Sequence, residues 1–221
     1  MNQKKRFVVL GLGSFGTALA GRLAENGGRV TGVDAIESRV EQAKDALYEA
    51  VVADVTDRNL LAQLSLENAA AVCISLGESI EPSLLAALHA KELKARRIVV
   101  KGVTEEHGKI LKRLGVDRVV FPEVEMARQL ADRETWSNVL DFLPIGEDHT
   151  LLEIAVPSSM SGKSLGEANI RRRYGISVLG VKDALTGRLS LNPDVDMQLT
   201  EDQLLLVIGH EDDIARFREV S

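Results

Sequence analysis

Cysteine and tryptophan each occur once in this sequence of 221 residues, and aromatic residues make up only 4% of it. The single thiol, Cys73, excludes an intrachain disulfide and a cysteine-based metal cluster. Its apolar surroundings, residues 71–74, favour a buried structural thiol over a nucleophile. No run approaches the roughly 20 apolar residues of a membrane-spanning helix, and no signal peptide is evident. We therefore expect a cytoplasmic protein that meets a membrane only through a partner.

Basic residues are outnumbered, with 27 Lys and Arg against 33 Asp and Glu, which gives a net charge of -6. A nucleic-acid partner needs a basic footprint, so we expect no nucleic-acid partner. The apolar share of 45% and the charged share of 27% are typical of a soluble globular protein. The length suits a medium domain followed by a small one.

Residues 1–137 alternate between short apolar runs and helical patterns. The strand-like runs cover 7–10, 30–34, 49–53, 70–76, 97–101 and 118–121. The helical patterns between and after them cover 16–26, 38–46, 59–64, 80–93, 105–114 and 122–132. Strands and helices in alternation predict an α/β domain with a doubly wound parallel sheet of the Rossmann type.

Residues 149–221 follow a different pattern, which predicts a small α+β domain. The expected strands cover 151–156, 176–181, 188–191 and 203–208, and the expected helices cover 164–174 and 212–219. Between the two domains, residues 138–148 contain Pro144-Ile145-Gly146, which is typical of a linker.

A glycine-rich segment, Gly11-Leu12-Gly13-Ser14-Phe15-Gly16, matches G-x-G-x-x-G after the first predicted strand and opens a helix. In this context Gly11 permits the tight turn, Gly13 lets a diphosphate approach the backbone, and Gly16 lets the helix pack closely. Asp34, at the end of the next strand, is placed to accept hydrogen bonds from the ribose hydroxyls. Its negative charge would also repel a 2′-phosphate, which disfavours an NADP-like ligand. The weaker alternative is a plain turn, with Asp34 capping the next helix.

Further candidates follow the other strands at the same edge of the sheet. Asp54, with Val55 after it, is placed either to meet an adenine amino group or to cap the helix near Asn59, and both remain open. Ser75-Leu76-Gly77 ends the fourth strand, where open α/β sheets bind ligands. Lys101 ends the fifth strand and either reaches a phosphate or stays solvated.

The sequence offers no recognisable catalytic group beside this cradle. Its four histidines, none of them paired with a partner at a known spacing, are His89, His107, His149 and His210. No serine elbow, H-E-x-x-H or Walker lysine is found. We therefore predict a binding protein and not an enzyme. An NAD-dependent oxidoreductase and an NADH-sensing regulator are the alternatives.

The whole pattern resembles the RCK (regulator of conductance of potassium) subunits of Trk/Ktr potassium-uptake systems. The resemblance covers nearly the full chain and is most specific in Leu114-Gly115-Val116-Asp117, then Phe121-Pro122-Glu123 and a small C-terminal domain. The other matching segments are 7–16, 30–34, 53–56, 98–101, 138–140, 173–176 and 205–209. The arrangement is closest to the Ktr type, with one TrkA-N and one TrkA-C unit.

This resemblance implies ATP or ADP at the glycine turn and dimers that assemble into an octameric ring. The ring docks beneath a membrane-embedded potassium-translocating subunit, at the inner face of the cell membrane, and controls potassium uptake. Ktr-type subunits carry Arg where this chain has Ser14, which leaves AMP and NAD(H) open as ligands. In relatives the residue matching Glu123 helps hold a divalent cation at the dimer interface. The alternative for Glu123 is an acid that complements the helix dipole.

The C-terminal domain and the helix after Pro122 carry two further expectations. In some relatives the C-terminal dimer interface binds cyclic di-AMP, for which Asn169, Arg171 and Arg173 are the candidates here. A solvated basic end of a helix is the favoured alternative for these residues. The apolar helix with Met126 and Leu130 is expected to be the crossover and dimer element, or else only a core helix.

Overall fold

The computed structural model describes residues 4–135, 139–146 and 148–220. The chain divides into two compact units, Met1–Glu123 and Val124–Ser221. The division falls inside helix α6 (Pro122–Thr135), whereas the sequence pattern placed it after residue 137. Within the described ranges, no helix combines the length and the apolar content that crossing a bilayer requires.

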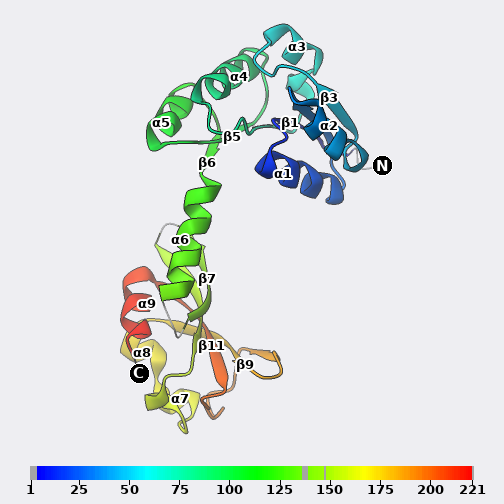
Figure 1. Cartoon of the computed structure of the whole chain (residues 1–221). Helices are drawn as coiled ribbons and strands as arrows, with labels where there is room; N and C mark the ends of the chain where they lie inside the picture. Colours follow the sequence, from blue (N-terminus) through cyan, green and yellow to red (C-terminus); the bar gives the residue numbers. More distant parts are fainter. Residues whose placement is uncertain (1–3, 136–138, 147, 221) are drawn as a thin grey trace. The chain divides into compact units, whose positions relative to one another are not determined.

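The first unit, coloured from blue to green in Figure 1, contains a parallel sheet. The sheet has six strands in the order β3-β2-β1-β4-β5-β6. Its strands are β1 (Arg6–Leu10), β2 (Arg29–Asp34), β3 (Glu49–Val52), β4 (Ala71–Ile74), β5 (Ile98–Lys101) and β6 (Arg118–Val120). Its helices are α1 (Ser14–Glu25), α2 (Glu37–Ala43), η1 (Lys44–Ala46), α3 (Arg58–Gln63), η2 (Leu66–Asn68), α4 (Ile80–Glu92) and α5 (Glu105–Arg113). This order confirms the predicted doubly wound sheet, in which strands are added outward from β1 on one side and from β4 on the other, so the strand order reverses between β1 and β4.

The two central strands are buried on both faces, which explains their continuous apolar sequences. Val8 of β1 and Val72 of β4 pack in one core with the inner sides of α3, α4 and α5. Val9 and Cys73, one position along, belong to a second core with α1 and α2. Burial raises the pKa of the Cys73 thiol to about 11, so the thiol stays protonated and serves packing.

The second unit contains a five-stranded sheet in the order β10-β9-β11-β8-β7. Its elements after α6 are β7 (Val139–Ile145), β8 (His149–Ala155), η3 (Ser158–Met160), α7 (Leu165–Ala168), α8 (Ile170–Tyr174), β9 (Ser177–Asp183), β10 (Leu189–Leu191), β11 (Gln203–His210) and α9 (Glu211–Arg218). All the pairings between these strands are antiparallel. The segment expected to be a linker thus contains β7, an edge strand paired with β8 over residues 139–145. Residues 138 and 147 of that segment lie outside the described residues.

The helix predicted over 164–174 is two short helices. Asn169 adopts a left-handed conformation (φ 46°) that separates α7 from α8. Ser164 and Glu167 form a reciprocal capping box that starts α7, which fixes where this helical segment begins. Ile170 is buried directly after the break and anchors α8 in the core beneath the sheet.

Candidate functional site

The glycine turn follows β1 at the edge of the sheet where the strand order reverses. The Gly11 N–H donates to Val33 O at 2.7 Å, and the Ser75 N–H donates to Leu10 O at 2.8 Å. Gly11 has a φ of 96°, and a Cβ there would lie 2.1 Å from Ser75 O. Both the conformation and the close approach to the end of β4 therefore require glycine at this position.

The other two glycines of the motif meet different constraints. A Cβ on Gly16 would lie 1.9 Å from Gly11 O, so this glycine is required for α1 to pack on the turn. A Cβ on Gly13 would meet no described atom within 4 Å, and its φ of -68° is open to any residue. Neither the backbone nor the packing of the fold requires Gly13. The free space beside it is what a phosphate approaching the backbone needs.

The N-terminus of α1 has no protein group to complete it among the described residues. Gly13 is its N-cap without a side-chain hydrogen bond, and the first turn holds no acid. The side chain of Ser14 is exposed, while Leu12 and Phe15 are buried and half-buried. The free N–H groups and the positive end of the helix dipole make this terminus suited to an anion.

Asp34 ties the glycine turn to the end of β2. Its buried carboxylate accepts the Leu12 N–H at 2.7 Å and the Ile36 N–H at 2.8 Å. Arg39, from α2, places Nη1 3.4 Å from Asp34 Oδ2. The contact with Leu12 links Asp34 to the cradle. The contact with Ile36 is a local turn and not a helix cap, because the N-cap of α2 is Ile36 and has no side-chain cap hydrogen bond, so the capping alternative for Asp34 is wrong. The sequence analysis did not predict that Arg39 belongs to this site. The only signal in the sequence was a basic residue five positions after the acid.

Asp54 lies in the turn after β3 and does not cap α3. Its Oδ1 accepts from the Thr56 N–H at 2.8 Å and from Thr56 Oγ1 at 2.7 Å, which lowers the pKa of the carboxyl. The N-cap of α3 is Asp57, which accepts the Asn59 N–H, so the capping alternative for Asp54 is wrong. Val55 packs in the core, so only its backbone is available to a ligand.

Lys101 and Glu123, predicted for separate roles, form an ion pair with each other. Lys101 at the end of β5 is mostly buried, whereas Glu123 in the first turn of α6 is exposed. The hydrogen bond from Lys101 lowers the pKa of the Glu123 carboxyl. Across the described residues, no group of three or more His, Cys, Asp or Glu has an arrangement that could hold a metal ion.

At the fourth strand, Ser75 is buried against the glycine turn, Leu76 is half-buried, and Gly77 is exposed with a φ of 65°. The structure therefore brings 11–16, Asp34 and Ser75 together through the contacts above. Lys101 ends β5, which pairs with β4, and so lies at the same edge of the sheet. These residues form one candidate site at the carboxyl ends of the central strands.

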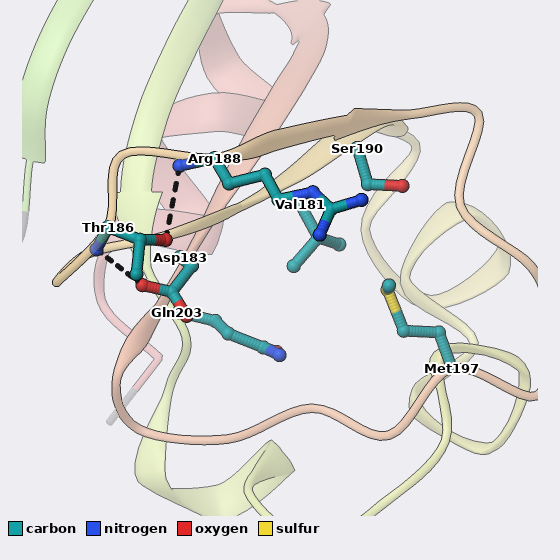
Figure 2. Close-up of a pocket in the computed structure, with 7 residues that line it drawn as sticks. All are labelled: Val181, Asp183, Thr186, Arg188, Ser190, Met197 and Gln203. Carbon is teal, nitrogen blue, oxygen red and sulfur yellow. Dashed lines mark hydrogen bonds between the residues drawn. The ribbon is translucent and has the colours of Figure 1, made fainter.

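The second predicted site, in the C-terminal unit, has less support from geometry. Asn169, Arg171 and Arg173 are exposed, and the Arg173 guanidinium lies 5.2 Å from the Tyr174 ring centroid. A hollow of about 470 Å³ in the same unit lies elsewhere (Figure 2). Its lining consists of Val181, Asp183, Thr186, Arg188, Ser190, Met197 and Gln203. None of the predicted site residues belongs to this lining.

Both units match known protein families. The family model of the TrkA-N domain matches residues 7–122, and that of the TrkA-C domain matches residues 150–221. Ktr system potassium uptake protein C of Bacillus subtilis (strain 168) is 36% identical over 216 residues, which cover 98% of this chain and 97% of that protein. Ktr system potassium uptake protein A of Vibrio alginolyticus is 32% identical over 211 residues, which cover 96% of this chain and 95% of that protein.

Solved structures support the fold. The GsuK channel is similar with a TM-score of 0.68 at 24% identity, over 99% of this chain and 40% of that one. The GsuK RCK domain is similar with a TM-score of 0.67 at 21% identity, over 99% of this chain and 48% of that one. This chain spans less than half the length of the GsuK chains, and the likeness at this identity shows a shared fold.

Proposed function

The chain belongs to the family of Ktr potassium uptake proteins, with one TrkA-N and one TrkA-C domain, and from this premise we propose that it is a regulatory subunit of a potassium-uptake system. In this proposal it binds an adenine nucleotide at the glycine turn in the cytoplasm. The nucleotide controls a membrane-embedded potassium-translocating subunit, beneath which copies of the chain assemble as dimers into an octameric ring. The role is binding and not catalysis.

The observation that carries the proposal is the uncapped start of α1 beside Gly13. The free space at Gly13 and the absence of an acid in the first turn suit a diphosphate. The carboxylate of Asp34 accepts the Leu12 N–H of the turn, and the Ser75 N–H donates to Leu10 O directly before the turn. A phosphate therefore meets N–H groups that are already oriented, so binding requires little reordering of the chain.

The nucleotide we propose is ATP or ADP, with AMP and NAD(H) as the competing ligands because Ser14 brings no charge. GsuK, a fold relative, is described in a form bound to NAD, so NAD belongs in any comparison. A divalent cation at Glu123 and cyclic di-AMP at the second unit remain proposals of the same kind. A ligand controls the partner only to the extent that it binds two conformations of the subunit with different affinity.

Thermal unfolding of the purified chain with ATP, ADP, AMP, NADH or no ligand tests the nucleotide. A ligand at about 100 times its Kd stabilises the folded state by about 2.7 kcal/mol. For a chain of this length, that shift raises the unfolding midpoint by several degrees. We expect a clear rise with ATP or ADP and little with NADH. Preference for NADH with the other ligands inert would overturn the ATP/ADP proposal.

The proposed dimer involves α6, whose apolar side chains stay exposed in the single chain. The exposed fractions are 46% for Val124, 63% for Met126 and 57% for Leu130. Solvent contact of this extent on one helix is typical of a surface that another chain covers.

We therefore expect the double variant Met126→Glu and Leu130→Glu to shift the oligomer to a lower mass in light scattering after size exclusion. The reason is that charged side chains are costly to bury in an apolar interface. A far-ultraviolet circular dichroism spectrum equal to that of the unaltered protein would show that the double variant is still folded. The control is Val195→Glu, an equally exposed apolar residue of the second unit, which we expect to leave the mass unchanged. An unaltered mass in the double variant would remove α6 from the interface.

A further inference from the structure

Arg39 lies beside the buried acid of the candidate nucleotide site. Its Nη1 is 3.4 Å from Asp34 Oδ2, and its side chain is 47% exposed, against 7% for Asp34. The same carboxylate also accepts two backbone N–H groups, from Leu12 and Ile36. An ionised carboxylate offers about four acceptor positions. Three of them are therefore engaged within the protein.

These three contacts reduce the number of hydrogen bonds that Asp34 can accept from a ribose. The ribose of an adenine nucleotide presents two adjacent hydroxyls, yet Asp34 retains about one acceptor position. Arg39 brings five N–H donors in a planar fork, of which one faces Asp34. Its positive charge also offsets the negative charge of Asp34. The repulsion that an unpaired acid exerts on a 2′-phosphate is reduced accordingly.

We propose that Arg39 determines the ribose specificity of the site, and that the site accepts adenine nucleotides with a phosphate on the ribose 2′ oxygen as well as unmodified ones. Arg39 donates to the 2′-phosphate through its guanidinium fork, while Asp34 continues to hold the glycine turn through Leu12. This inference rests on the proposed nucleotide binding. It reverses the expectation from sequence that Asp34 disfavours an NADP-like ligand.

Calorimetric titration of the full chain with ADP and with 2′-phospho-ADP tests the inference. In the unaltered protein, we expect the two affinities to agree within about tenfold. In Arg39→Gln, we expect the affinity for 2′-phospho-ADP to fall by about tenfold or more, because a hydrogen bond to a charged group is lost. The affinity for ADP should change by less than about threefold in the same variant.

Arg58→Gln is the matched control. Arg58 is an exposed arginine that forms an ion pair with Glu92 at 3.0 Å, outside the contacts of the glycine turn. Its substitution should alter neither affinity. Arg39→Lys, which retains the charge and loses the fork, should give an intermediate loss for 2′-phospho-ADP alone.

Three results overturn the inference. If ADP binds and 2′-phospho-ADP does not, the site excludes the 2′-phosphate and the proposed function survives alone. If Arg39→Gln weakens both ligands equally, or neither, Arg39 does not determine ribose specificity. If ADP does not bind the unaltered protein, this inference fails, and the proposed function fails with it only if ATP does not bind either.

Discussion

Replacing Gly13 with Ala is expected to remove nucleotide binding while leaving the protein folded. A Cβ at this position meets no described atom within 4 Å, and the φ of -68° suits alanine. The fold should lose less than about 1 kcal/mol, the difference between glycine and alanine at an N-cap. The added methyl group occupies the space that a phosphate needs, and overpacking of a tight contact costs about 1–3 kcal/mol. At the upper end, the affinity falls by about two orders of magnitude.

The measurement is the thermal shift at a fixed nucleotide concentration. At 100 times the original Kd, a variant weakened by about 100-fold retains only about 0.4 kcal/mol of ligand stabilisation, which leaves almost no shift. The matched control is Gly21→Ala in the interior of the same helix, where a Cβ also meets nothing. This control should gain up to about 1 kcal/mol of stability and bind as before. Full binding by Gly13→Ala would place the phosphates away from the start of α1.

The first unit could be predicted closely because its determinants are local. The run 7–10 is apolar at every position, which specifies a strand buried on both faces, and the glycine turn ends it. Repetition of strand and helix then leaves few topologies, since parallel strands need crossovers of one hand. The positions of Gly11 and Gly16 follow for the same reason. For Gly16 the constraining atom is Gly11 O, five residues away, and for Gly11 it is the backbone oxygen of Ser75, directly after the neighbouring strand β4.

The contacts that shape the candidate site depend on residues far apart in the sequence. Asp34 and Leu12 are separated by 22 positions, as are Lys101 and Glu123. Each side chain had a local alternative as a cap or a solvated group. Only the folded chain shows that the carboxylate of Asp34 is shared between the turn and Arg39. Pairing of this kind has no periodic signal in the sequence.

The second unit shows the same limit at the level of secondary structure. Pro144 and Gly146 indicated a linker, yet the segment forms the edge strand β7 because β8 supplies the partner. An edge strand tolerates proline, since one side of its backbone has no ladder to complete. Asn169 interrupts a segment with good helical composition, because asparagine tolerates the left-handed region at modest cost. Pairing with β8 decides that residues 139–145 form a strand, and the backbone conformation of Asn169 decides that the helical segment is interrupted. The amino-acid composition of the two segments predicts neither outcome.

Replacing Gly16 with Ala is expected to destabilise the first unit, whereas replacing Gly13 with Ala is not. The new Cβ would lie 1.9 Å from Gly11 O, a backbone atom fixed between β2 and β4. Because the backbone cannot yield as a flexible side chain does, α1 must shift away from the turn. Overpacking in a tightly packed region costs about 3 kcal/mol at the upper end of the usual range. The unfolding midpoint should fall by about 10 °C.

Unfolding followed by circular dichroism without ligand measures this effect, with Gly13→Ala and Gly21→Ala as the comparisons. The three substitutions add the same methyl group to the same helix or its cap, and only one of them meets backbone. A large loss confined to Gly16→Ala would separate the glycine that the fold requires from the glycine that the ligand requires. If Gly16→Ala has the same unfolding midpoint as Gly13→Ala and Gly21→Ala, α1 packs more loosely on the turn than the structure indicates. In that case the N–H groups at its start are not held in place for a phosphate, and preorganisation cannot explain the affinity.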